Sequence, residues 1–324
     1  MDQLPAFGKK IEEIVMPTMK AYAPLLQRNA DFIKSVKKET FTYGSHERQQ
    51  LDVYSPLEAK ITNGRRPVLM FEYGGGFVNG AKTLMPMPDG LVHANIGAFF
   101  ANHFGYTVVV ADYRLMSHGA KFPSGGEDIA LAVEWICENE PGPGSEPIDL
   151  FTMGNSAGGV HLSTFLLHQS FSKTRRKVLT GNKTRLRGAV MLSVPFDFNL
   201  APAYRSEILK SYFSDIEANC PLGLLRTAQE KVESIDFVNA GAKVLVLSGE
   251  LDPDNDILIP RDNFVDEWLH MGENDYRVSL AVDSMPRHNH ISPFASLGTG
   301  IEEEEAWGCQ VAAFCDNIRK FAPR

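Results

Sequence analysis

Apolar residues follow two spacings along the chain, and segments with the two spacings alternate. Short, nearly continuous apolar runs rich in β-branched residues predict strands, most of them covered on both faces. These runs lie at residues 50–54, 68–73, 107–111, 150–154, 188–192, 243–247 and 276–282. Apolar positions three or four residues apart predict helices at residues 1–40, 128–138, 157–168, 264–271 and 306–321. This alternation indicates an α/β protein with a mostly parallel central sheet and helices on both faces.

One stretch, residues 195–242, interrupts the alternation. It separates two predicted strands and is rich in aromatic residues, which are Phe196, Phe198, Tyr204, Tyr212 and Phe213. Insertions of this length in a compact domain usually serve a function. We therefore expect residues 1–324 to form a single domain with a functional insertion.

The composition is that of an ordinary globular protein and excludes several classes. Hydrophobic residues make up 44% of the 324 positions and charged residues 22%, which excludes a disordered chain. The 32 Lys and Arg residues against 40 Asp and Glu residues give a net charge of −8, which argues against nucleic acid as a partner. The four cysteines are too scattered for a disulfide framework or a zinc ribbon.

The sequence shows no secretory signal and no membrane-spanning segment. The first residues lack the basic and apolar regions of a secretory signal. No apolar run reaches the ~18 residues that a membrane span needs. We expect a cytoplasmic protein with reduced thiols and no membrane span.

The most specific chemical signal is the pentapeptide GNSAG at residues 154–158. It follows one predicted strand and precedes a predicted helix, which gives the short motif its specificity. In such a GxSxG turn, small neighbours let a serine occupy a tight corner with its hydroxyl exposed above the sheet. Ser156 is therefore the candidate nucleophile.

Three consecutive glycines, Gly74, Gly75 and Gly76, end another predicted strand. Consecutive glycines let backbone N–H groups converge on one point, as the stabilisation of a developing oxyanion requires. A phosphate-binding loop is the alternative, but the spacing fits neither GxGxxG nor a P-loop. The pattern favours an oxyanion loop.

Candidate acids and histidines follow the last two predicted strands. The acids are Asp252, Asp254 and Asp256, and the histidines are His288 and His290. A carboxylate at the carboxyl end of a strand can reach a site above the sheet, and Asp252 lies nearest to such an end. The chain order of serine, acid and histidine is the order of α/β-hydrolases.

Four motifs, in this order, resemble α/β-hydrolases of the hormone-sensitive-lipase and carboxylesterase type. They are YGGGF at residues 73–77, DYRL at 112–115 with FP at 122–123 and Asp128, GNSAGG at 154–159, and GELDP at 249–253. The resemblance implies an α/β-hydrolase fold with a helical cap. Two departures are visible, because Tyr73 replaces the histidine of the HGGG esterases and residues 116–118 replace their APE.

The same resemblance implies roles for individual residues. The implied catalytic residues are Ser156, Asp252 and His290. His290 matches best because the apolar Ile291 follows it, and His288 stays open as the alternative base. The implied oxyanion donors are the backbone N–H groups of Gly75, Gly76 and Ala157.

We expect a serine hydrolase that cleaves carboxylic esters of small to medium hydrophobic substrates through an acyl-enzyme. No metal or organic cofactor is implied, and the protein would act as a monomer or a homodimer. Residues 1–40 and 196–240 would form the cap. The expected substrate contacts are Phe77, Phe196, Phe198 and Tyr212.

Three alternatives stay open. The same site can serve an amidase such as an arylformamidase, or an acyl-transfer or cyclisation enzyme of a biosynthetic pathway, because a shielded acyl-enzyme can meet another nucleophile. From another class, the chain can be a non-catalytic ligand-binding receptor on a hydrolase scaffold.

Overall fold

A single mixed sheet organises the computed structural model, which describes residues 1–84, 87–230, 236–270 and 279–322. Within these residues eight strands follow the order β1-β2-β4-β3-β5-β6-β7-β8. Their bounds are β1 Lys37–Thr42, β2 Gln50–Ser55, β3 Arg66–Glu72, β4 Thr107–Ala111, β5 Ile148–Asn155, β6 Thr184–Leu192, β7 Lys243–Gly249 and β8 Leu280–Met285. The pairs β1–β2 and β2–β4 are antiparallel, and every pair from β4 to β8 is parallel.

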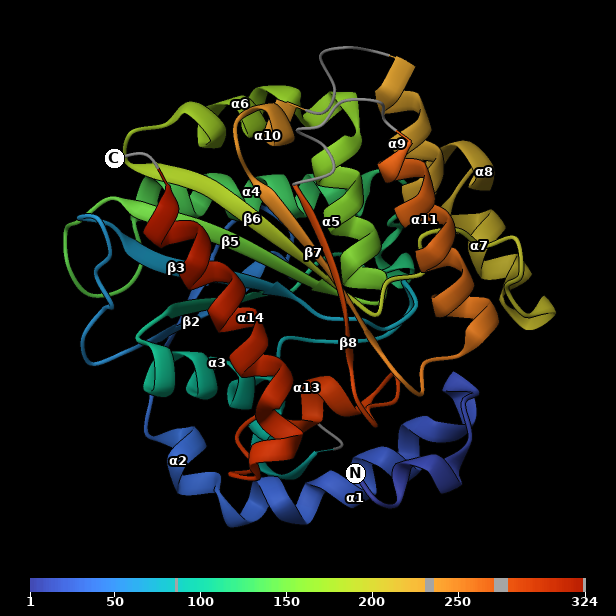
Figure 1. Ribbon diagram of the computed structural model, residues 1–324, viewed down its shortest axis with the longest axis horizontal. Coiled ribbons are helices and arrows are strands. Elements are labelled where there is room, and N and C mark those ends of the chain that lie inside the picture. The colour runs from blue at the N-terminus through green and yellow to red at the C-terminus, as the bar shows by residue number, and fades with distance from the viewer. Residues whose placement is uncertain (85–86, 231–235, 271–278, 323–324) are drawn as a thin grey trace.

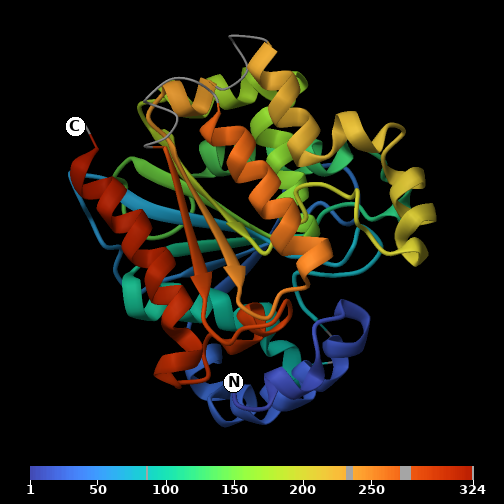
Figure 2. The same cartoon turned by 45° about the vertical axis from the view of Figure 1, so that its right-hand side comes forward.

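Helices cover both faces of the sheet (Figures 1 and 2). One face carries α4 Ser124–Asn139, α5 Ala157–Leu167, α6 Ser172–Thr180, α9 Pro221–Glu230, α10 Asp236–Asn239 and α11 Ile259–Leu269. The other carries α1 Ile11–Arg28, α2 Ala30–Lys34, α3 Leu91–Phe104, α13 Ser292–Ser296 and α14 Glu302–Phe321. No helix of the described residues is long and apolar enough to span a membrane.

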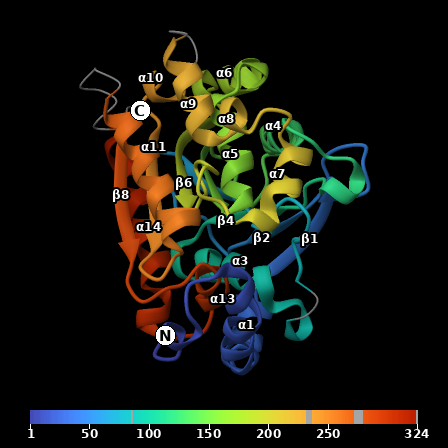
Figure 3. The same cartoon turned by 90° about the vertical axis from the view of Figure 1, so that its right-hand side faces the viewer.

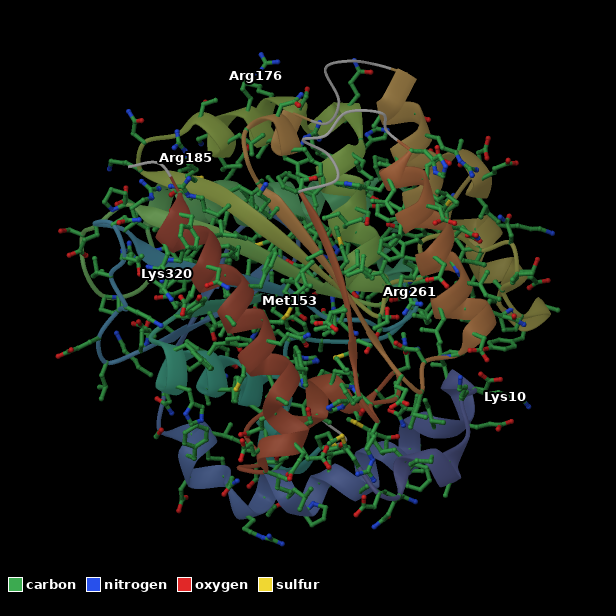
Figure 4. All side chains as sticks on the ribbon, viewed as in Figure 1. Lys10, Met153, Arg176, Arg185, Arg261 and Lys320 are labelled. Atoms are coloured by element: carbon green, nitrogen blue, oxygen red, sulfur yellow. The ribbon has the colours of Figure 1, made fainter. Side chains whose placement is uncertain are left out.

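Alternation along the buried strands builds a separate core on each face. In β3, Val68 and Met70 belong to the core under α4 and α5, whereas Leu69 and Phe71 belong to the core under α3 and α14. Successive side chains of a strand point to opposite faces, so a continuously apolar strand supplies both cores. Figure 4 shows Met153 of β5 in the middle of the molecule.

The predicted elements are present, with differences at their ends. Residues 107–111 form β4 as predicted, while α4 begins at Ser124, before the predicted start at residue 128. Helix was wrongly predicted for residues 37–40, which lie in the edge strand β1. All six residues of β1 are exposed, so no buried side marks it in the sequence. Part of the predicted strand 276–282 and the end of the predicted helix 264–271 lie outside the described residues.

The two predicted cap segments flank the carboxyl ends of the parallel strands. In Figure 3, which faces these ends, α1 lies below and α7 Ser206–Tyr212, α8 Ile216–Asn219 and α9 lie above. The segments contact each other where Tyr204 Oη donates a hydrogen bond of 2.8 Å to Glu12 Oε2. The amino-terminal segment also reaches the loop after β7 through Lys9 and Asp254, 3.1 Å apart.

The last helix is fixed to the sheet by one fully buried arginine. Arg319 of α14 donates hydrogen bonds to the carbonyl oxygens of Lys60 and Arg65, at 2.6 and 2.9 Å. Its Nε lies 3.5 Å from the carboxylate of Asp149 on β5. A buried guanidinium persists only where acceptors surround it in this way.

We expect Arg319→Ala to lower the free energy of unfolding by about 3–5 kcal/mol, because it removes the cation from a buried ionic network. Urea denaturation measures this change. The neighbouring, exposed Lys320 (Figure 4) supplies the control, and Lys320→Ala should change stability by less than about 0.5 kcal/mol. Equal losses in the two variants would contradict this role of Arg319.

Candidate active site

Ser156 occupies a strained turn between β5 and α5. Its φ of 52° and ψ of −121° are a conformation that residues with a side chain rarely adopt. The turn is possible because its neighbours are glycines. A Cβ on Gly158 would lie 2.2 Å from the carbonyl oxygen of Glu72, and one on Gly154 would lie 2.6 Å from the Cα of Gly159. The backbone is therefore packed too closely for any larger residue at either position.

Three side chains from distant parts of the chain form one line of hydrogen bonds. His290 Nε2 lies 3.0 Å from Ser156 Oγ, and His290 Nδ1 lies 2.8 Å from Asp252 Oδ1. Asp252 and His290 are almost fully buried. The other oxygen of Asp252 accepts hydrogen bonds from Ser193 Oγ at 2.7 Å and from the backbone N–H of Gly249 at 2.6 Å. These bonds fix the carboxylate in an orientation that can hold the imidazole.

The two histidines of the last loop differ in what they contact. His288 Nδ1 pairs with Ser292 Oγ at 2.8 Å, whereas His290 faces Ser156. Burial lowers the pKa of His288 to about 4. Asn289 holds the loop between them, since its Oδ1 accepts from the backbone N–H of Ile291 and its Nδ2 donates to Thr18 of α1.

The predicted oxyanion loop lies against the serine. A Cβ on Gly74 would be 2.9 Å from Ser156 Cβ, and one on Gly75 would be 2.0 Å from the carbonyl oxygen of Asn79. Gly75 and Gly76 have φ values of 141° and 62°, which glycine adopts without strain. Within the described residues, no acceptor takes a hydrogen bond from the backbone N–H groups of Gly75, Gly76 or Ala157. These three N–H groups thus remain available, in a loop whose Gly74 lies against Ser156 and in Ala157, which directly follows it.

Tyr73 holds this loop at its start. Its hydroxyl donates to Asp112 Oδ1 at 2.6 Å and accepts from Arg48 Nη2 at 2.7 Å. Its ring stacks on Tyr113, with centroids 4.7 Å apart, and Tyr113 Oη donates to the carbonyl oxygen of Tyr73 at 2.9 Å. Tyr73, which stands where the HGGG esterases have a histidine, therefore anchors the start of the loop through these contacts. Sequence reasoning missed Arg48 and Ser193, because no short motif joins them to the site, and it noted Asp112 within the DYRL motif without a role of its own.

Three of the four predicted substrate contacts gather beside the oxyanion loop. Phe77 stacks on Tyr212 with ring centroids 4.4 Å apart and meets Phe198 edge-on at 6.4 Å. Phe196 does not join them, because it is fully buried and stacks on Phe264 of α11 at 4.2 Å. It packs in the core under α11.

Comparison with known proteins places this architecture in a family. Residues 51–253 match the family model described as BD-FAE. The chain belongs to the BD-FAE family. The match includes the glycine-rich loop, the serine turn and Asp252, and it ends before His290.

Curated relatives of this BD-FAE member carry esterase names. A probable isoprenylcysteine alpha-carbonyl methylesterase of Arabidopsis thaliana is 26% identical over 192 residues, which are 57% of this chain and 41% of that protein. A liver carboxylesterase of Sus scrofa is 30% identical over 161 residues, which are 47% of this chain and 26% of that protein. The chain thus matches less than half the length of either relative.

Solved structures show the fold over almost the whole chain. An esterase B of Lactobacillus rhamnosis superposes with a TM-score of 0.60 at 16% identity, covering 94% of this chain and 96% of that one. A hyperthermophilic esterase of Pyrobaculum calidifontis gives a TM-score of 0.55 at 18% identity, covering 95% and 94%. The predicted α/β-hydrolase fold, with a mostly parallel sheet and helices on both faces, is confirmed.

Buried ionisable groups surround the site of this BD-FAE member. Glu72, at the end of β3, has no hydrogen-bond partner for either carboxylate oxygen among the described residues, and burial raises its pKa well above the usual value. His161, on α5, lies in contact with Phe77, Tyr113 and Tyr212, and burial lowers its pKa to about 3. The imidazole of His161 is therefore neutral at pH 7. The described residues hold no cluster of His, Cys, Asp and Glu suited to a metal ion.

The lowered pKa of His161 makes the fold sensitive to acid. Between pH 6.5 and about 3 the unfolded chain binds a proton at this residue that the folded chain does not, so its contribution to stability falls as the pH falls. Glu72 acts in the opposite direction above pH 4.5, because its folded form keeps a proton that the unfolded chain loses.

When the pH is lowered from 7 to 5, the free energy of unfolding should fall in both the wild type and His161→Gln. We expect the fall to be about 2 kcal/mol smaller in His161→Gln, because the variant has no imidazole to protonate on unfolding. Urea denaturation at the two pH values measures the difference. His270→Gln, at an exposed position, should follow the wild type. Identical losses in His161→Gln and the wild type would show that His161 titrates normally in the fold.

Proposed function

We propose that the chain is a serine hydrolase that cleaves carboxylic esters. The observation that carries the proposal is the line of hydrogen bonds from Ser156 through His290 to Asp252, beside three unoccupied backbone N–H donors. A nucleophile, a base within hydrogen-bond reach and a third group that orients the base are the parts that acyl transfer needs. A receptor that had lost catalysis would not need to keep all of them in register.

The first half of the reaction forms an acyl-enzyme. Ser156 Oγ attacks the acyl carbon of the ester while His290 Nε2 takes the hydroxyl proton. Asp252 holds the other ring nitrogen of His290 and stabilises the imidazolium. The N–H groups of Gly75, Gly76 and Ala157 donate hydrogen bonds to the carbonyl oxygen as it becomes negative. Each donor stabilises the transition state by about 3 kcal/mol.

The first half ends when the bond between the acyl carbon and the alcohol oxygen breaks. His290 gives its proton to the departing alcohol, and the acyl group remains bonded to Ser156 Oγ. The second half releases the acid. His290 then takes a proton from a water molecule, whose oxygen attacks the same acyl carbon. Collapse of the second tetrahedral intermediate returns the proton to Ser156 and frees the carboxylic acid.

The surroundings favour a hydrophobic substrate of small to medium size. The aromatic side chains of Phe77, Phe198 and Tyr212 crowd the space beside the oxyanion loop. We infer that residues 1–40 and 196–240 supply the cap, because α1 of the first range and α7, α8 and α9 of the second lie beside the carboxyl ends of the strands (Figure 3). The esterase names of the two curated relatives support the reaction class. On the sequence grounds given above, we also infer a cytoplasmic enzyme that acts as a monomer or a homodimer.

We expect Ser156→Ala to abolish hydrolysis of short p-nitrophenyl esters, a loss of about 10⁵-fold or more in kcat, because the variant has no nucleophile. Release of p-nitrophenol in a stopped assay measures it. Ser163→Ala, on the same helix α5, should keep most of the activity, since the Ser163 hydroxyl contacts the carbonyl oxygen of Gly159 and the sulfur of Met191 and neither His290 nor Asp252. Full activity in Ser156→Ala would overturn the mechanism.

A further inference from the structure

An arginine and an aspartate face each other near the proposed active site without forming a hydrogen bond. Arg205 ends a short 3-10 turn of the insertion, Ala203–Arg205, and Asp256 lies in the π-helical turn after β7, Asp254–Leu258. Arg205 Nη1 and Asp256 Oδ1 are 3.7 Å apart, beyond hydrogen-bond distance. Their side chains are only 13% and 10% exposed. The pair is therefore largely shielded from solvent, although the two side chains do not form a hydrogen bond with each other.

One atom of the pair lacks the partner that a buried polar group normally has. Asp256 Oδ1 is buried and has no hydrogen-bond partner among the described residues. Across the same residues, the guanidinium of Arg205 donates no hydrogen bond to a protein acceptor. A buried carboxylate oxygen without a partner costs free energy, which a bound group that donates to it would recover.

Two observations place the pair beside the reacting centre. The guanidinium lies over the ring of Phe198, 5.8 Å from its centroid, and Phe198 meets Phe77, which directly follows Gly76 of the predicted oxyanion loop. On the other side, Asp256 lies four residues after Asp252, whose carboxylate pairs with His290 Nδ1 at 2.8 Å. Burial raises the pKa of Asp256, and the neighbouring guanidinium of Arg205 opposes that shift.

The position of Arg205 is fixed by its own segment. The preceding residue, Tyr204, is hydrogen-bonded to Glu12 of α1, and Glu12 also interacts electrostatically with Arg205. The two predicted cap segments meet at this point. A guanidinium held in this way is available for recognition because little side-chain entropy is left to lose.

The chemistry of the pair selects the group that fits between them. Arg205 offers only donors and the ionised Asp256 offers only acceptors. A carboxylate would accept from Arg205 but meet the negative charge of Asp256, and an ammonium would meet the positive charge of Arg205. A hydroxyl or a carboxamide satisfies both, since it accepts from the guanidinium and donates to the carboxylate.

We propose that Arg205 and Asp256 form a polar subsite that binds a neutral hydroxyl or carboxamide group on the substrate, away from the ester bond. The proposal rests on the proposed esterase function and defines its substrate class. The substrate is an ester whose apolar part lies along Phe77 and Phe198 and whose far end carries a group that both donates and accepts. The subsite takes part in binding only and in no covalent step.

Matched esters test the subsite. One series carries a terminal hydroxyl, a terminal methoxy group or no substituent on acyl chains of graded length, and a second series carries the same groups on the alcohol. At the chain length that reaches the pair, the wild type should cleave the hydroxyl ester about tenfold to a hundredfold better in kcat/KM than the methoxy ester, which cannot donate. The preference for the hydroxyl ester should appear as a lower KM with little change in kcat.

Variants separate recognition from structure. Arg205→Met and Asp256→Ala should each lower the ratio of kcat/KM for the hydroxyl ester to kcat/KM for the methoxy ester from at least about tenfold to about one, measured within each variant. Arg226→Met is the control from the same insertion, because Arg226 pairs with Glu267 on an exposed surface, and this variant should keep the preference. A preference that survives in Arg205→Met and Asp256→Ala would overturn the subsite.

Two further outcomes are informative about different claims. If the wild type cleaves the unsubstituted esters but prefers the hydroxyl at no chain length on either side, the subsite is wrong and the esterase function stands. If the wild type cleaves no ester at all, both the proposed function and the subsite are overturned.

Discussion

The turn at Ser156 is the constraint on which the rest of the site depends. A residue with a side chain stays at a positive φ only where its surroundings leave no alternative. Here the close approach of α5 to the end of β3 removes the alternatives, since the Gly158 position lies against the carbonyl oxygen of Glu72. The parallel register that pairs Glu72 with Gly154 brings the glycine loop to the same edge as the serine. The close packing of α5 against the end of β3 thus accounts both for the strained backbone of Ser156 and for the position of the predicted oxyanion loop beside it.

The other catalytic candidates reach this point because parallel strands end at one edge of the sheet. Asp252 follows β7 and His290 follows β8, so their side chains meet Ser156 although long stretches of chain separate them. The amino-terminal segment closes the arrangement, since Thr18 holds Asn289 beside His290. In an α/β sheet, the loops after parallel strands place their functional side chains together at the carboxyl edge. The segments that lie beside this edge determine which substrates bind there.

The sequence predicted those parts that depend on local pattern. β4 was predicted with its observed bounds because a β-branched run leaves few alternatives, and the serine turn was predicted because only small residues fit around it. The edge strand β1 was missed because both of its sides are exposed. The stacking of Phe196 on Phe264 was not predicted, because the packing partner of an aromatic residue in the insertion lies far away in the sequence. Neither the choice between His288 and His290 nor the pairing of Arg205 with Asp256 is a local property, since each depends on elements far apart in the sequence.

Covalent labelling with a fluorophosphonate tests the central claim most directly, because the reagent reports an activated serine without any assumption about the substrate. We expect one phosphonyl group per chain, found by mass spectrometry on the peptide that contains Ser156. Labelling should be slowed by at least about a hundredfold in His290→Gln and retained in His288→Gln. Absence of label on Ser156 in the folded protein, or a loss of labelling in His288→Gln but not in His290→Gln, would contradict the assignment of Ser156 as nucleophile and His290 as its base.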